Sequence, residues 1–143
     1  LEAEGEVRRA GPVFEASVKL DPEATIGRLG YARSFIRAGK MWAALKVLER
    51  AEETLKAAGL FEKHREEWLF LKGRALLALD RREEAEEPLT EASKIEGVRP
   101  EIFFYLGEAL AARKSSEARA AYMRYLELEP DGAHRRRAER AIR

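Results

Sequence analysis

The sequence of 143 residues contains no cysteine, no asparagine and no glutamine. Without cysteine, the chain cannot form a disulfide framework or a zinc site with cysteine ligands. Without asparagine, it has no N-glycosylation sequon. Valine, isoleucine and threonine are also scarce, and these are residue types in which strands are rich. The absences therefore exclude a disulfide-stabilised class and argue against an all-β fold.

Long apolar runs are missing too. No run reaches the roughly 18 residues that a membrane span needs, and the start lacks the basic and apolar segments of a secretory signal. We therefore expect no membrane span and a cytoplasmic location. Because the chain begins with Leu1 instead of methionine, we also expect it to be part of a longer parent chain.

Helix-forming residues fill the sequence. Alanine, glutamate, arginine, leucine and lysine account for 91 of the 143 residues, well above the roughly 50% that is typical of long helices. The net charge is only +1, so this composition does not indicate disorder. The lack of labile residues is thermophile-like, although a GC-rich genome would also favour alanine, arginine and glycine. The composition predicts an all-α protein.

Small residues recur at sequence intervals of 12 and then 7. The two sets with this spacing are Ala32, Ala44 and Ala51, and Gly73, Ala85 and Ala92. The interval from Gly73 to Gly107 is 34, whereas the interval from Ala32 to Gly73 is 41. The difference of seven is nearly two helical turns, so it lengthens a helix without rotating its apolar face. The chain is therefore predicted to repeat a unit of the shorter length, once with an insertion.

Proline and glycine indicate where the helices begin and end. Pro22 and Pro100 stand at expected first helical positions, and Gly39, Gly59 and Gly97 follow expected helix ends. Helices are predicted at 6–20, 23–38, 40–58, 62–79, 82–96, 100–113, 115–128 and 131–142. Neighbouring helices would pair as antiparallel hairpins, with the small residues at the close crossings.

These features resemble the tetratricopeptide repeat (TPR), whose 34-residue pattern combines aromatic and Leu-Gly positions with alanines and a closing proline. The last repeat matches through Phe103, Phe104, Tyr105, Leu106, Gly107, Leu110, Ala118, Tyr122 and Pro130. The earlier repeats match through Tyr31, Ala32, Phe35, Gly39, Ala44, Leu48 and Ala51, and through Leu69, Gly73, Leu76, Ala85, Leu89 and Ala92. Ala10, Phe14, Ser17 and Leu20 resemble a second helix without its first.

The resemblance implies an α-solenoid of antiparallel hairpins that forms a right-handed superhelix. It divides a single domain, 1–143, into a leading half repeat 1–22, repeats 23–59, 60–98 and 99–130, and a capping helix 131–143. The core is predicted to contain Tyr31, Phe35, Leu45, Leu48, Leu69, Leu76, Leu89, Phe103, Leu106, Leu110, Tyr122 and Leu126.

The chain also departs from the family pattern. Arg28 replaces a large apolar residue, Lys72 interrupts the Leu-Gly pair, and one residue is missing near Lys114. Pro12 and Pro88 fall inside expected helices, where a proline would bend the helix, unless those helices begin at the proline.

No sequence motif indicates an enzyme. The chain has no phosphate-binding loop, dinucleotide-binding glycine motif, zinc-protease helix or serine-hydrolase elbow. His64 and His134 are far apart in the sequence, and His64 is expected to face solvent. The acidic run 83–87 could hold a divalent cation weakly, although a solvated helix face is the simpler interpretation. We predict no catalytic residue, no cofactor and no metal site.

The resemblance implies that the function is protein–protein interaction in a concave groove. Transferred to this sequence, the groove residues are Leu29, Arg33, Ile36, Arg37, Phe70, Arg74, Leu77, Phe104, Tyr105 and Glu108. Arg33 and Arg74 occupy equivalent places, which favours a partner segment with acidic and apolar residues; alternatively, Phe70 and Phe104 pack as core. Some family members use a carboxylate clamp that includes asparagine, and this chain has none.

Other functions remain open at this point. The segment 6–20, with Val7, Phe14 and Val18, could mediate self-association into a homo-oligomer, or the chain could be an intramolecular regulatory section. Arg135, Arg136 and Arg137 could contact nucleic acid, although a capping helix also needs a polar outer face.

Overall fold

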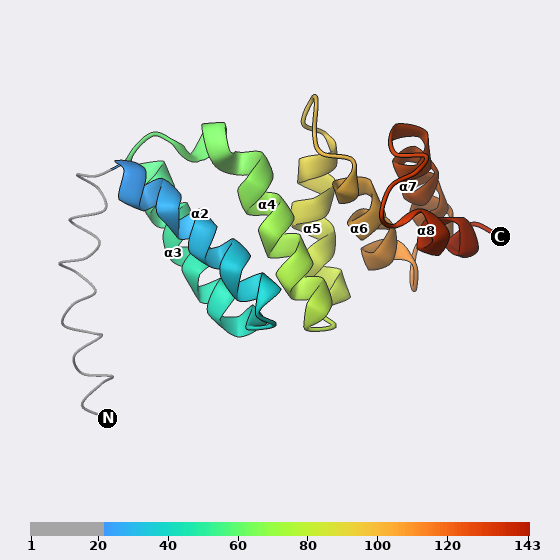
Figure 1. Ribbon diagram of the computed structural model, residues 1–143, viewed down its shortest axis with the longest axis horizontal. Helices are drawn as coiled ribbons and strands as arrows, with labels where there is room; N and C mark the ends of the chain where they lie inside the picture. Colours follow the sequence, from blue (N-terminus) through green and yellow to red (C-terminus); the bar gives the residue numbers. More distant parts are fainter. Residues whose placement is uncertain (1–21) are drawn as a thin grey trace. The chain divides into compact units, whose positions relative to one another are not determined.

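The structure is a computed structural model that describes residues 22–143, and in this range it consists of seven α-helices without a strand (Figure 1). The helices are α2 (Pro22–Arg37), α3 (Met41–Ala57), α4 (Phe61–Ala78), α5 (Arg82–Ser93), α6 (Glu101–Leu110), α7 (Ser115–Leu128) and α8 (Arg135–Ala141). The prediction of an all-α protein is confirmed. The predicted helix 6–20, the half repeat 1–22 and Pro12 lie outside the described residues, and the repeat boundaries stay a prediction.

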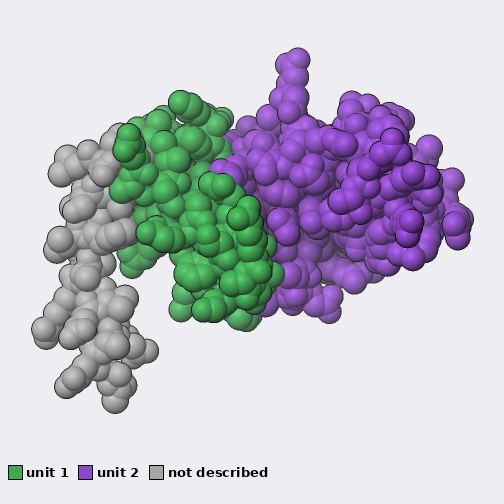
Figure 2. Space-filling view, in the orientation of Figure 1, with its two compact units in different colours: residues 1–64 green, residues 65–143 purple. Residues whose placement is uncertain are grey.

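The described residues form two compact units, 22–64 and 65–143, which Figure 2 shows in different colours. The described part of unit 1 contains α2, α3 and the first residues of α4, and unit 2 contains the remainder of α4 with α5 to α8. Helices that are consecutive in the chain pack on each other: α2 on α3 in unit 1, and α5 on α6, α6 on α7 and α7 on α8 in unit 2.

The turns show how the sequence ends its helices. Gly39 has φ 77°, and the N–H of Lys40 donates to the carbonyl of Phe35 at 2.8 Å, which closes the end of α2. Gly59 has φ 71° at the end of α3, and Gly97 also has a positive φ of 73°. The three predicted left-handed glycines are therefore confirmed.

Asp80 is a left-handed residue that ends α4, as the glycines end the earlier helices, and no sequence pattern predicts it. Its φ is 59°, and the N–H of Arg81 donates to the carbonyl of Leu76 at 2.9 Å. Aspartate tolerates the left-handed region better than most residues with a side chain. The turn between Leu110 and Ser115 has no residue with positive φ, in agreement with the missing residue near Lys114.

In unit 2, glycines stand where two helices of a hairpin come closest. A Cβ atom added to Gly73 of α4 would lie 2.5 Å from the side chain of Leu89 in α5. A Cβ atom on Gly107 of α6 would lie 2.8 Å from the ring of Tyr122 in α7. Both distances are too short for carbon atoms, so each large side chain fills the space that a glycine leaves open.

Pro88 lies inside α5, which begins at Arg82. The alternative that this helix begins at the proline is therefore wrong. The Pro88 ring is buried, as is its neighbour Leu89, so the proline belongs to the packed face of the helix. Because proline has no backbone N–H, α5 lacks one of its internal hydrogen bonds at this position.

α3 is shorter than predicted by one residue at each end, and three other helices are shorter by more. α5 ends at Ser93, whose hydroxyl donates to the carbonyl of Thr90 at 2.6 Å, and not at residue 96. α6 ends at Leu110 instead of 113, and α8 covers 135–141 instead of 131–142. Before α8, Gly132 and Arg135 donate backbone hydrogen bonds within successive turns, so this segment approaches α8 as turns.

Most of the predicted core is confirmed, with one error. Tyr31 is 64% exposed, because the buried face of α2 follows Thr25, Leu29, Ala32 and Ile36, which recur at helical spacing, and Tyr31 lies beside that face. The residues that are buried as predicted are Leu48, Leu69, Leu76, Leu89, Leu106, Leu110 and Tyr122. Four other predicted core residues are only half-buried: Phe35, Leu45, Phe103 and Leu126.

The two departures from the family pattern in α2 and α4 have different environments. Arg28 is 4% exposed, so the position is buried although its side chain is a guanidinium. Lys72 places its ammonium 4.9 Å from the centre of the Trp68 ring, one turn away on α4. Trp68 is 4% exposed, whereas Trp42, at the start of α3, is 61% exposed.

Among the described helices, none is long and apolar enough to cross a membrane.

Candidate functional site

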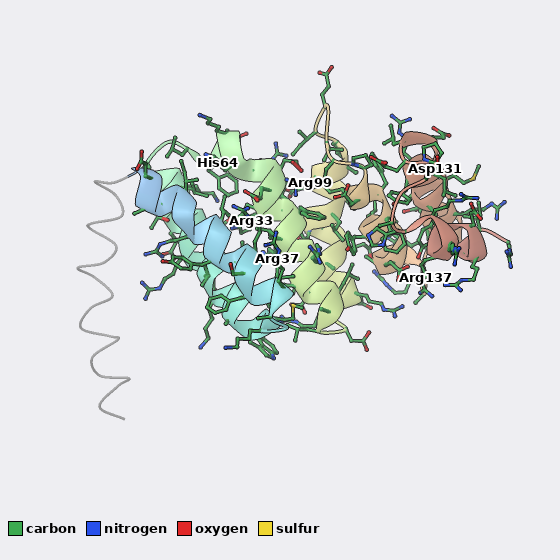
Figure 3. The ribbon with its side chains drawn as sticks, in the orientation of Figure 1. Arg33, Arg37, His64, Arg99, Asp131 and Arg137 are labelled. Atoms are coloured by element: carbon green, nitrogen blue, oxygen red, sulfur yellow. The ribbon has the colours of Figure 1, made fainter. Side chains whose placement is uncertain are left out.

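The four groove residues predicted on α2 divide into two pairs. Leu29 is fully buried and Ile36 is 5% exposed, so both are core side chains. Arg33 and Arg37, one turn apart on α2, are exposed (Figure 3). In unit 1, the predicted groove residues that a partner can reach are therefore the two arginines.

The six groove residues predicted in unit 2 also divide by burial. Phe70 is 5% and Phe104 is 6% exposed, which supports the alternative that both pack as core. The residues that are half-buried are Arg74, Leu77, Tyr105 and Glu108. The structure brings Phe70, Arg74 and Tyr105 to one place, and it directs Glu108 elsewhere, to Tyr122 and Arg137.

Arg74 lies in a pocket of ≈ 360 Å³, which we call the Arg74 pocket. Its volume is near the lower end of the range of about 300–1,000 Å³ that is usual for binding pockets. Its lining residues are Phe70, Arg74, Glu101, Tyr105, Tyr125, Glu129, Gly132, Ala133 and His134. They come from α4, α6, the end of α7 and the segment before α8, all within unit 2.

Aromatic rings form the wall of the Arg74 pocket. The His134 ring stacks on Phe104, with ring centres 4.1 Å apart and an angle of 9° between the planes. Tyr105 meets His134 edge-on at 5.4 Å, and its ring centre is 5.8 Å from that of Phe70. Offset and edge-to-face pairs at these distances stabilise the arrangement beyond their buried area.

Two arginines lie over this wall. The Arg74 guanidinium is 5.5 Å from the ring centre of Phe70 and 5.4 Å from that of Tyr105. Arg99 lies 4.5 Å from the Phe70 ring and donates two hydrogen bonds to Glu66, at 2.6 and 3.1 Å. Arg99 is thus neutralised, whereas no carboxylate of the described residues lies within ion-pair distance of Arg74.

A turn after α7 places His134 against the wall. The backbone N–H of His134 donates to the Tyr125 hydroxyl at 3.0 Å. Gly132 leaves room for that hydroxyl, since a Cβ atom at this position would clash with it and lie 2.9 Å from Cβ of Glu129. The glycine therefore permits the close approach that seats the histidine.

Burial sets the protonation of the polar rings. Desolvation lowers the pKa of His134 below its ordinary value; Glu101 and Glu108 oppose this shift, and Arg74 adds to it. Desolvation also raises the pKa of the Tyr105 hydroxyl, against the effect of Arg74. Both shifts favour the uncharged form of the rings, and the other ionisable side chains that line the pocket are Arg74, Glu101 and Glu129.

Glu108 belongs to a different group of residues. It accepts a hydrogen bond from the Tyr122 hydroxyl at 2.9 Å and two from Arg137, at 3.1 and 3.2 Å. The pKa of Tyr122 is raised, mainly because burial desolvates the hydroxyl and secondly because the hydroxyl donates its hydrogen bond to Glu108. The prediction that Glu108 lines the same groove as Arg74 is therefore not supported by its contacts, because its carboxylate is engaged with α7 and α8.

The arginine run before the end of the chain does not form one patch. Arg135 pairs with Glu139 at 2.8 Å and with Asp131 at 3.2 Å, and Arg137 pairs with Glu108. Arg136 is exposed without an ion pair to the described residues. Consecutive residues of a helix point about 100° apart, so the three side chains serve different neighbours.

The acidic run in α5 pairs with basic residues. Glu86 accepts from Lys114 at 2.6 Å and from Arg113, and Glu83 lies 3.5 Å from Arg113. In the part of the chain that the structure describes, no group of three acidic or histidine side chains could hold a metal ion. His64 differs from the expectation of a solvent-facing ring, because its Nε2 is buried without a hydrogen-bond partner among the described residues.

The sequence predicts only part of the Arg74 pocket. The repeat positions predict Phe70, Arg74 and Tyr105, but they do not predict Tyr125 or His134. The latter two depend on how the turn after α7 folds back, and Gly132 is the only local signal for that close approach. No protein-family model, curated protein sequence or solved structure matches this chain.

Proposed function

We propose that this chain is a protein-interaction module of the tetratricopeptide type, in which stacked hairpins form an α-solenoid and bind a segment of a partner protein. The sequential packing of the helices supports this proposal, as do the glycines at the hairpin crossings. These glycines occupy positions on which the resemblance to the repeat rests.

The observation that carries the proposal is the Arg74 pocket. Arg74 holds its charge above two aromatic rings in a concave site that Glu101 and Glu129 also line, and no carboxylate of the described residues lies within ion-pair distance of it. Aromatic and arginine side chains contribute a large share of binding energy at protein interfaces. A partner residue with a carboxylate would pair with Arg74, and a neighbouring apolar side chain would cover the rings of Tyr105 and His134.

The proposal can be tested with peptides selected from a random display library on the purified chain. Selected peptides should be rich in acidic residues beside aromatic or aliphatic ones. Arg74→Glu should weaken their binding about tenfold or more, since a charge-assisted hydrogen bond contributes about 1.5–3 kcal/mol. Lys94→Glu is a matched control, because it makes the same charge change at an exposed position beyond the end of α5.

The double variant Arg33→Glu plus Arg74→Glu tests the equivalence of the two positions. If both arginines contact the partner, the double variant should lose more binding than Arg74→Glu alone. Unchanged binding in the double variant would refute the proposal.

The alternatives make different predictions. Self-association through 6–20, which lies outside the described residues, would appear as a concentration-dependent mass in light scattering. Nucleic-acid binding through Arg135–Arg137 would appear as a salt-dependent shift of a generic duplex. The ion pairs of Arg135 and Arg137 disfavour it, because those charges are already compensated.

A further inference from the structure

A second pocket of unit 2 brings together arginines that are distant in the sequence. It lies between α7 and α8, has a volume of ≈ 380 Å³, and we call it the α7–α8 pocket. Its lining residues are Ala111, Ser115, Ala118, Arg119, Tyr122, Arg137, Arg140 and Ala141. Three of them are arginines, and none of these lining residues is acidic.

The charges in this pocket are only partly compensated. Arg137 is paired with Glu108, and Arg119 donates to the carbonyl of Ile142, a neutral acceptor. Neither Arg119 nor Arg140 makes an ion pair with any described residue. Two positive charges therefore face one concavity, and their mutual repulsion would be relieved by an anion.

The other lining residues of the pocket are small or aromatic. Three alanines and the Tyr122 ring supply apolar surface beside the arginines, and the Tyr122 hydroxyl already donates to Glu108. Ala118 and Tyr122 are buried, whereas the three arginines are exposed, so an anion can reach the guanidinium groups from solvent. Ser115 adds one hydroxyl donor to the lining.

We infer that the α7–α8 pocket binds a phosphate monoester dianion. Its two uncompensated charges match a dianion, and guanidinium groups bind phosphate oxygens through paired hydrogen bonds. A nucleic-acid backbone fits less well, because it needs a continuous basic track. Beyond this pocket, Arg124 pairs with Glu127 and Arg135 with Glu139, which interrupts such a track.

This site is separate from the Arg74 pocket, and the two pockets share no lining residue. Phosphate binding at the α7–α8 pocket can therefore be confirmed or refuted independently of the proposed peptide binding. The dianion could belong to a phosphorylated side chain of a partner or to a small free phosphate ester, and the two sources present the same chemical group.

The test uses phosphorus NMR of phosphoserine titrated with the full chain. We expect a saturable shift, and about tenfold or more weaker binding in the variant Arg119→Gln plus Arg140→Gln, since each substitution removes charge-assisted hydrogen bonds. The matched control is Arg124→Gln plus Arg136→Gln, which removes the same charge from the same two helices outside the pocket. This control should bind as the wild type does.

Competition between phosphorylated ligands shows which kind of molecule supplies the phosphate group. A phosphoserine peptide that binds more tightly than phosphoserine indicates a modified partner, and glycerol phosphate that binds as tightly as the peptide indicates a free ester; both support the site. The absence of a saturable shift, equal binding by both double variants, or displacement by duplex DNA at lower concentration would overturn it. If the pocket variant unfolds by circular dichroism, Arg140→Gln alone provides the same comparison, because it leaves the hydrogen bond from Arg119 to Ile142 in place.

Discussion

The α4/α5 and α6/α7 hairpins of unit 2 close by the same packing and differ in what the closing residue does. In each, a glycine of the first helix faces a large side chain of the second, Leu89 opposite Gly73 and Tyr122 opposite Gly107. Leu89 only fills space. Tyr122 fills space and also donates to Glu108, which in turn holds Arg137 of α8.

This difference shows how a repeated packing position can acquire a second role. Exchanging an aliphatic residue for tyrosine keeps the hairpin closed and adds a hydroxyl that attaches the next helix. The Arg74 pocket and the α7–α8 pocket both depend on α7 and the segment after it, whereas the residues of α5 line neither of them.

The largest effect is expected for Gly73→Leu. Leu89 is fully buried, so the added side chain cannot be accommodated without moving the helices, and overpacking of this kind costs about 3 kcal/mol at its upper range. Urea unfolding followed by circular dichroism would measure it. Gly27→Ala is the control: apart from its chain neighbours and the backbone of its own helix, no described atom lies within 4 Å of its added Cβ, so it should stabilise by about 0.5–1 kcal/mol. An unchanged unfolding midpoint in Gly73→Leu would show that α4 and α5 do not cross at this position.

A smaller effect is expected for Gly132→Ala, which acts only on the end of the α6/α7 hairpin. The new Cβ would displace the Tyr125 hydroxyl and with it the N–H of His134, at a cost of about 1–2 kcal/mol. Near-ultraviolet circular dichroism should lose intensity as the aromatic wall loosens. A spectrum equal to that of the wild type would contradict the role assigned to Gly132.

Tyr122→Phe separates the two roles of Tyr122. The ring stays opposite Gly107, and only the hydrogen bond to Glu108 is lost, so we expect about 1 kcal/mol of destabilisation. The α6/α7 hairpin should stay folded in urea unfolding experiments, while hydrogen exchange in α8 becomes faster. Leu89→Met in α5 is the comparison, since it changes only packing and should leave exchange in α8 unaffected.

The smallest effect is expected for the pH dependence of stability. The pKa of His134 is lower in the folded state than its ordinary value of about 6.5, so the unfolded chain binds more protons in the window between the two values. The contribution of His134 to the free energy of unfolding is therefore fully present above that window and is lost as the pH falls through it. His134→Phe keeps a ring against Phe104 and should flatten this part of the curve of melting temperature against pH. A curve identical to that of the wild type would contradict the assignment.

The sequence predicts those features that depend on neighbouring residues in a helix or turn. The glycines after α2 and α3, the hairpin crossings and the number of helices from residue 22 onward follow from local spacing. Tyr31 and Asp80 escape prediction for different reasons. The face that α2 buries is decided by its packing partners, and the left-handed conformation of Asp80 is forced by the turn that α4 and α5 require.

The candidate sites are less predictable than the helices. The repeat assigns Phe70, Arg74 and Tyr105 to one face, and they do meet, but Leu29 and Ile36 are assigned to the same face and are buried. The convergence of Arg119 with Arg140 depends on the angle at which α8 returns to α7, and no pattern within either helix encodes that angle.

The placement of the two tryptophans gives each unit its own optical reporter. Trp42 is exposed in unit 1 and Trp68 is buried in unit 2 beneath the ammonium of Lys72. Their emission should therefore differ in wavelength and in quenching by iodide. With Trp42→Phe and Trp68→Phe variants, the unfolding of either unit can be followed by fluorescence alone, which shows directly whether the two units melt together.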